Sequence, residues 1–74
     1  MSALVKVKGI LLRETELALE IQQTIADGQA WHRAWIPRGQ CHHISKRLTT
    51  EDTVEAVVEL PEWLADAKEL EVEP

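Results

Sequence analysis

The stretch TVEAVVEL, from Thr53 to Leu60, carries an apolar residue at every second position. Successive side chains of a β-strand point to opposite faces of a sheet, so this period of two is typical of a strand with one buried face. The pattern predicts a strand in which Glu55 and Glu59 face outward. The inward side chains are those of Val54, Ala56, Val58 and Leu60.

Three segments that precede this strand show the same period. The first covers residues 3–11, and Gly9 inside it predicts a β-bulge. Polar residues 13–16 predict a turn into a second strand, which spans residues 17–22. The third segment, residues 30–37, ends at its proline, because proline cannot donate to a sheet ladder. The inward side chains of the first strand are Val5, Val7 and Leu11, with Lys6 and Lys8 between them.

The second segment also fits a helix. Leu17, Ile21 and Ile25 are spaced by four residues, and Gly28 suits the end of a helix. Asp27-Gly28, however, is typical of a tight hairpin turn, and another alternating segment follows it. We therefore favour the strand and predict a hairpin.

The remaining residues predict one irregular region and one helix. Residues 38–52 show no clear period, although Ile44 and Leu48 are spaced for a single helical turn. Pro61 suits the first position of a helix that we expect to run from Glu62 to about Leu70. Its apolar side is predicted to consist of Trp63, Ala67 and Leu70.

With 74 residues, the chain has room for one small domain, residues 1–74, in which the acidic residues 71–74 are expected to fray. We predict an α+β fold, a small bent antiparallel sheet of about four strands with one short C-terminal helix. The sheet is either open or a partly closed barrel. The first strand and the strand over residues 53–60 are expected to be in contact.

The charges of the chain are divided between its two parts. Residues 1–50 contain seven Lys and Arg against four Asp and Glu, whereas residues 51–74 contain one Lys against nine acids. The net charge of −5 is unfavourable for nonspecific DNA binding, and an acidic C-terminal face most simply serves solubility. The three glycines are isolated, so no phosphate-binding loop is present. We expect no enzyme, no cofactor and no small-molecule substrate.

Cysteine content and hydropathy predict the compartment. The single Cys41 cannot form an internal disulfide, which suits a reducing environment. Apolar runs such as Ile10 to Leu12 are far shorter than the roughly 20 residues of a membrane span. The N-terminal alternation of valine and lysine does not fit a secretory signal. We expect a cytoplasmic protein without membrane contact.

Three stretches resemble a group of small uncharacterised proteins encoded by bacteriophages and prophages. They are residues 7–16 (VKGILLRETE), 34–43 (AWIPRGQCHH) and 60–65 (LPEWLA), and the central motif is Trp-Ile-Pro, a basic residue, a small residue and Gln. The group often has Ser where this chain has Gly39. The resemblance implies a compact β-rich fold and an origin in a mobile element, and it implies no activity.

Cys41, His42, His43 and the upstream His32 are the only cluster of soft metal ligands in the sequence. A structural zinc site needs four converging ligands, and adjacent residues rarely point at one ion. The spacing therefore predicts surface histidines and a half-buried thiol, with no metal site. A Cys/His nucleophile is permitted by residue type, but no third orienting group is identifiable.

The strongest functional signal is the set of alternate residues Trp31, Arg33 and Trp35 on the third strand. Tryptophan and arginine dominate the energetics of protein interfaces, and tryptophan also stacks on the bases of single strands. With no Phe or Tyr, the domain alternatively needs these indoles for its core. We predict a non-enzymatic interaction module that binds a protein partner or itself, and the alternative is a small OB- or SH3-like protein that binds single-stranded nucleic acid. The candidate binding residues are Trp31, Arg33, Trp35, Arg38 and Gln40.

Overall fold

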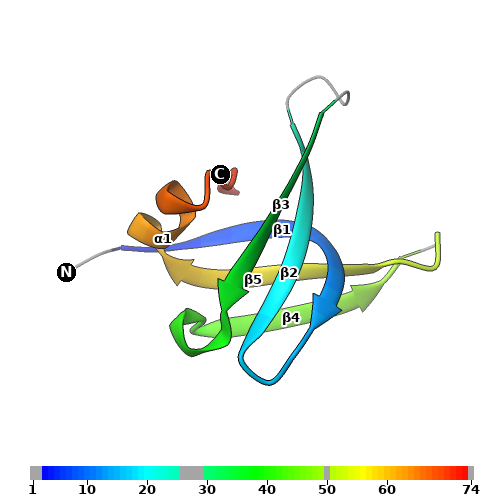
Figure 1. Ribbon diagram of the computed structural model, residues 1–74, viewed down its shortest axis with the longest axis horizontal. Helices are drawn as coiled ribbons and strands as arrows, with labels where there is room; N and C mark the ends of the chain where they lie inside the picture. Colours follow the sequence, from blue (N-terminus) through cyan, green and yellow to red (C-terminus); the bar gives the residue numbers. More distant parts are fainter. Residues whose placement is uncertain (1–2, 26–29, 50, 74) are drawn as a thin grey trace.

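The computed structural model describes residues 3–25, 30–49 and 51–73 and contains one five-stranded antiparallel sheet and a short helix (Figure 1). The elements are β1 (Leu4–Glu14), β2 (Ala18–Ile25), β3 (Ala30–Pro37), the 3₁₀ turn η1 (Arg38–Gln40), β4 (His43–Leu48), β5 (Val54–Pro61) and α1 (Glu62–Ala67). The strand order is β3-β2-β1-β5-β4, and the sheet is not closed within the described residues. The small antiparallel sheet with one short C-terminal helix is thus confirmed, although it has five strands.

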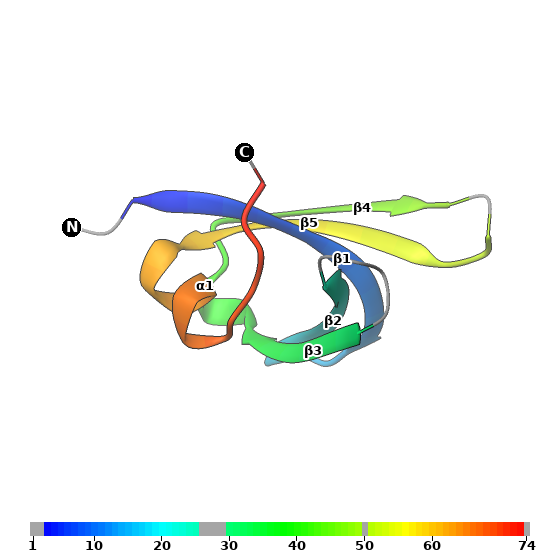
Figure 2. The same cartoon turned by 90° about the horizontal axis from the view of Figure 1, so that it is seen from above.

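Strand β1 is shared by the two halves of the sheet. Residues Leu4–Leu11 pair with β5, and Ile10–Glu14 pair with β2. Figure 2 shows the result: β4 and β5 lie on one side of the core, β2 and β3 lie on the other, and β1 passes from one layer to the other. The expected contact between the first strand and residues 53–60 is confirmed, with Val7 opposite Val58.

Gly9 lies where β2 approaches β1. A Cβ atom at this position would be 2.8 Å from the backbone oxygen of Gln22. The bulge predicted at Gly9 is wrong, because the register shift lies further along β1, between Leu11 and Arg13. Glycine is needed at position 9 because two backbones come close together there.

The strand prediction for the second segment is confirmed, and the helix alternative is wrong. Strand β2 pairs with β3 along its whole length, from Ala18 opposite Pro37 to Ile25 opposite Ala30. The Thr15 hydroxyl accepts the N–H groups of Leu17 and Ala18 at 3.3 and 3.0 Å, which shapes the turn between β1 and β2. The predicted Asp27-Gly28 turn lies outside the described residues.

Strand β4 was not predicted from the alternation of residues. It pairs with β5 from His43 opposite Glu59 to Leu48 opposite Val54, so the helical turn expected from Ile44 and Leu48 is wrong. Only Ile44 in this strand packs against the core, and its other side chains are exposed. An edge strand with a single half-buried side chain produces no apolar period.

The core lies between the two layers of the sheet. Its fully buried large side chains are Val7, Leu19, Ile21, Ile36, Val58 and Leu60. The inward positions predicted for Ala56, Val58 and Leu60 are confirmed, whereas Val54 is only half-buried. Helix α1 closes one end of the core with Leu64 and Ala65.

The buried side of the C-terminal helix differs from the prediction. Trp63 is 50% exposed and Ala67 is exposed, whereas Leu64 and Ala65 are buried. Pro61 is both the last residue of β5 and the N-cap of α1, so the strand and not the apolar spacing sets which side of the helix meets the sheet. The helix ends at Ala67, and buried Leu70 reaches the core only after Glu69, which has a left-handed φ of 56°.

Residues 71–73 lie along β1 and are bonded to it, contrary to the expected fraying. Val72 forms an antiparallel bridge with Val7, and the N–H of Glu73 donates to the carbonyl of Lys6 at 2.7 Å.

Replacing Val58 by alanine is expected to lower the free energy of unfolding by about 1 to 3 kcal/mol, because the side chain is fully buried between the layers. Leu17→Ala is the control, since Leu17 is 82% exposed and its truncation is expected to have little effect. Urea denaturation measures both. Equal midpoints for Val58→Ala and wild type would contradict the observed core.

Gly9→Ala is expected to destabilise the fold by about 1 to 3 kcal/mol, because the added Cβ must push β2 away from β1. Gly39→Ala is a matched control, since a Cβ there has no atom within 4 Å. The control is expected to be neutral or slightly stabilising. If thermal unfolding gives both variants the same midpoint, the close approach at Gly9 has no structural role.

Candidate interaction surface

Strand β3 has one buried and one exposed face. Ala34 and Ile36 are buried in the core, while Arg33 and Trp35 are exposed on the other face. Trp35 is 39% exposed and lies outside the buried core, so the core role considered for the tryptophans does not apply to it. The side chain of Trp31 lies outside the described part of the structure, and its binding role stays a prediction.

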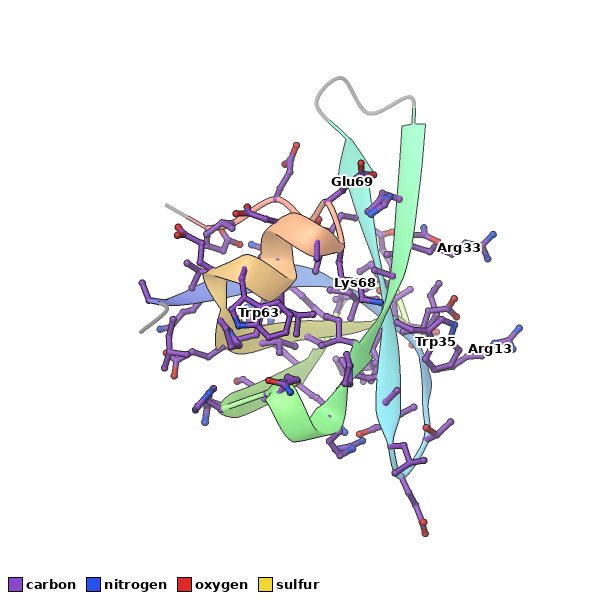
Figure 3. All side chains as sticks on the ribbon, turned by 60° about the vertical axis from the view of Figure 1, so that its left-hand side comes forward. Arg13, Arg33, Trp35, Trp63, Lys68 and Glu69 are labelled. Carbon is purple, nitrogen blue, oxygen red and sulfur yellow. The ribbon has the colours of Figure 1, made fainter. Side chains whose placement is uncertain are left out.

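The neighbouring strands add charged residues to this face. Glu20 lies opposite Trp35 and Gln22 opposite Arg33, while Arg13 of β1 lies opposite Glu20. Figure 3 shows Arg13, Arg33 and Trp35 pointing to the same side of the molecule, away from α1. These three residues, with Glu20 and Gln22 between them, are called the Trp35 face.

The two arginines of the Trp35 face are largely free. The Arg13 side chain is 76% exposed, and its Nε is 3.8 Å from the Glu20 carboxylate. An exposed pair at this distance contributes little, so it leaves Arg13 available to another carboxylate. Arg33 forms no ion pair with a described residue. The face therefore combines an accessible indole with two accessible guanidinium groups.

Arg13 was not predicted as a binding residue, because it was assigned to the turn. The register shift after Leu11 changes which alternate residues of β1 face the core. As a result, Arg13 joins the outer face and Glu14 turns to the inner side, opposite Leu19. Without the shift, Arg13 would lie on the same side as Leu11. No signal in the sequence places the bulge at this point.

Arg38 and Gln40 do not extend the Trp35 face. Arg38 pairs through Nη2 with the carboxylate of Glu14 and also donates to the carbonyl of Thr15 at 3.2 Å. Lys46 Nζ donates to the same carboxylate at 2.7 and 2.8 Å. Gln40 is exposed on η1, beyond the end of β3. Arg38, which was predicted as a binding residue, is instead held by Glu14 together with Lys46.

The Glu14 cluster, which consists of Glu14, Arg38 and Lys46, connects three elements. It joins the end of β1 to η1 and to β4, and therefore links the two layers of the sheet. Hydrogen bonds from Lys46 and then from Arg38 lower the pKa of the Glu14 carboxyl from its ordinary value of 4.5. The arrangement is structural, because it occupies both cations.

The cysteine and the histidines lie in separate environments. Burial raises the pKa of the Cys41 thiol, whose Sγ is 3.5 Å from the carbonyl of Pro37, so the nucleophilic thiolate is disfavoured. His32 Nε2 donates to the carbonyl of Lys68 at 2.6 Å and thus connects β3 to the end of the helix. His42 and His43 are exposed. Among the residues that the structure describes, no three Cys, His, Asp or Glu side chains form a group able to hold a metal ion.

The chain matches no protein-family model, no curated protein and no solved structure. The resemblance to phage proteins therefore stays a prediction from its motifs. In the described part of the chain, no helix has the length and apolar character needed to cross a bilayer.

Glu14→Gln is expected to lower the urea midpoint at pH 7, because it removes the charge that holds Arg38 and Lys46. A carboxyl with a lowered folded pKa stabilises the fold above its ordinary value of 4.5 and loses this contribution as the pH falls through the folded value. The difference from wild type should thus shrink below pH 4.5, and also in high salt.

Glu16→Gln is the control for this experiment, because Glu16 is exposed and forms no ion pair with a described residue. A midpoint difference for Glu14→Gln that is constant between pH 7 and pH 3 would show that its charge is not responsible.

Proposed function

We propose that the protein is a non-enzymatic interaction module, of the phage type that its Trp-Ile-Pro-Arg-Gly-Gln motif suggests, and that the Trp35 face binds an acidic surface of a protein partner. The observation that carries the proposal is the exposed Trp35 indole between the guanidinium groups of Arg33 and Arg13. The lone Cys41 thiol suits the cytoplasm as its location. We assign it no catalytic step.

The chemistry of the Trp35 face favours carboxylates. A guanidinium group binds a carboxylate through two parallel hydrogen bonds, and the planar indole buries a large rigid area at small entropic cost. Tryptophan and arginine are the residue types most enriched among the residues that dominate binding energy. An acidic surface with an apolar centre would satisfy both arginines and cover the indole.

The balance of charge argues against a nucleic acid as the first choice. Arg38 and Lys46 are held by Glu14, and Arg47 pairs with Glu55. A chain of net charge −5 with only Arg13 and Arg33 beside the indole has little field with which to hold a polyanion. Single-stranded nucleic acid, which would stack on Trp35, is the second candidate.

The proposal is tested by NMR titration of the labelled protein, at physiological salt, with the acetylated peptide Asp-Gly-Asp-Leu-Asp-Gly-Asp, whose leucine supplies the apolar centre. This peptide is acidic and has a low tendency to pair as a strand. We expect shifts at Arg13, Arg33 and Trp35, and a loss of affinity of about fivefold or more in Trp35→Ala and in Arg33→Ala. Trp63→Ala and Arg47→Ala are matched controls, because both side chains are exposed on other elements. They should leave binding unchanged.

Three results would contradict the proposal. Equal losses in Trp63→Ala and Trp35→Ala would mean that binding does not depend on the Trp35 face. Micromolar binding of a 20-nucleotide single strand at physiological salt, weakening steeply as salt rises, would favour the nucleic-acid candidate. A dimer that Trp35→Ala dissociates would identify a second copy as the occupant of the face.

A further inference from the structure

Among the residues that the structure describes, the first half of β1 has a strand neighbour on only one side. Residues Leu4–Leu11 pair with β5, but β2 pairs with β1 only from Ile10 onward. The opposite edge of β1 is therefore left to the C-terminal tail, residues 71–73, through the bridge between Val7 and Val72. This edge is a place where an extended segment pairs with β1.

A buried side chain holds the backbone of the tail. Gln23 is only 8% exposed, and its Nε2 donates to the carbonyls of Lys8 and Glu71 at 2.9 and 3.0 Å. Its Oε1 accepts the N–H of Glu71 at 2.8 Å. The carboxamide thus satisfies both backbone groups of Glu71, and it takes no part in recognising the side chain of that residue.

The remaining contacts of the tail with described residues are few and exposed. One backbone hydrogen bond joins Glu73 to Lys6, and a 3.6 Å ion pair joins Glu73 to Lys8 at the surface. Val72 is exposed, and the tail borders a hollow lined by Lys8, Ile10, Gln22 and Glu55. A segment held by so few buried contacts opens locally at low cost.

We propose that this edge of β1 is a binding site for an extended acidic segment of another protein, and that the tail occupies the site until such a segment displaces it. The partner pairs with β1 as an added strand, since main-chain hydrogen bonds give affinity in this mode. Its chemistry follows from the segment already bound, Glu71-Val72-Glu73, because the Lys8 ammonium group pairs with a carboxylate at the position of Glu73. The site is separate from the Trp35 face.

The test removes residues 71–74 and leaves the buried Leu70 in place. The probe is the acetylated peptide Glu-Val-Glu-Val-Glu, titrated by NMR into the truncated and the intact chain. We expect at least tenfold tighter binding to the truncated chain, with shifts along Leu4–Lys8 and at Gln23. Lys-Val-Lys-Val-Lys and Glu-Val-Pro-Val-Glu should bind weakly, because one reverses the charge and the other interrupts strand pairing.

Two substitutions in the truncated chain assign the site. Lys8→Glu should weaken binding of the acidic peptide, because it replaces a paired cation by a like charge, whereas Arg33→Glu should leave binding unchanged. The reverse result would place the peptide on the Trp35 face; it would overturn the present proposal and leave the proposed function standing.

Two further results decide the remaining cases. If the truncated chain does not fold, Glu73→Lys in the full chain replaces the ion pair with Lys8 by a repulsion, which weakens the attachment of the tail, and carries the same titration. The proposal is overturned if neither altered chain binds the peptide more tightly than wild type. It is also overturned if wild type forms a dimer that truncation dissociates, because the occupant would then be the tail of a second copy.

Discussion

The double pairing of β1 is the constraint on which the rest of the structure depends. This strand pairs with β5 and with β2, and the two pairings overlap only at Ile10 and Leu11. Gly9 permits the change, because any side chain there would collide with the backbone oxygen of Gln22. The bend that results brings two layers together over one core, and it leaves the first half of β1 with an edge that the tail covers.

The register shift after Leu11 connects the core to the surface. Because the shift exchanges the two faces of β1, it directs Arg13 outward beside Glu20 and Glu14 inward toward Arg38 and Lys46. One irregularity in backbone pairing thus supplies a cation to the Trp35 face and an anion to the cluster that joins the layers. Because the positions of Arg13 and Glu14 depend on the same register shift, a change in that shift would alter both the Trp35 face and the contact between the two layers.

The uneven charge of the sequence is partly cancelled inside the folded domain. The acidic tail lies along the lysines of β1, and Glu14 takes two of the remaining cations. Arg33 and Arg13 stay accessible beside Trp35. The net charge of −5 therefore does not describe the local charge of each surface. The Trp35 face is basic, whereas the region of α1 and the tail is acidic.

Alternation alone determined the strands at residues 53–60 and 30–37 and the inward set Ala56, Val58 and Leu60, because each segment has one buried face. It also determined that Arg33 and Trp35 share a side of β3. Contacts distant in sequence decided the rest. Strand β4 exists because it pairs with β5, α1 takes its orientation from Pro61, and Arg38 is drawn to Glu14. The face of β1 on which Arg13 lies and the position of the tail both depend on where β2 meets β1. Only the folded backbone specifies that point.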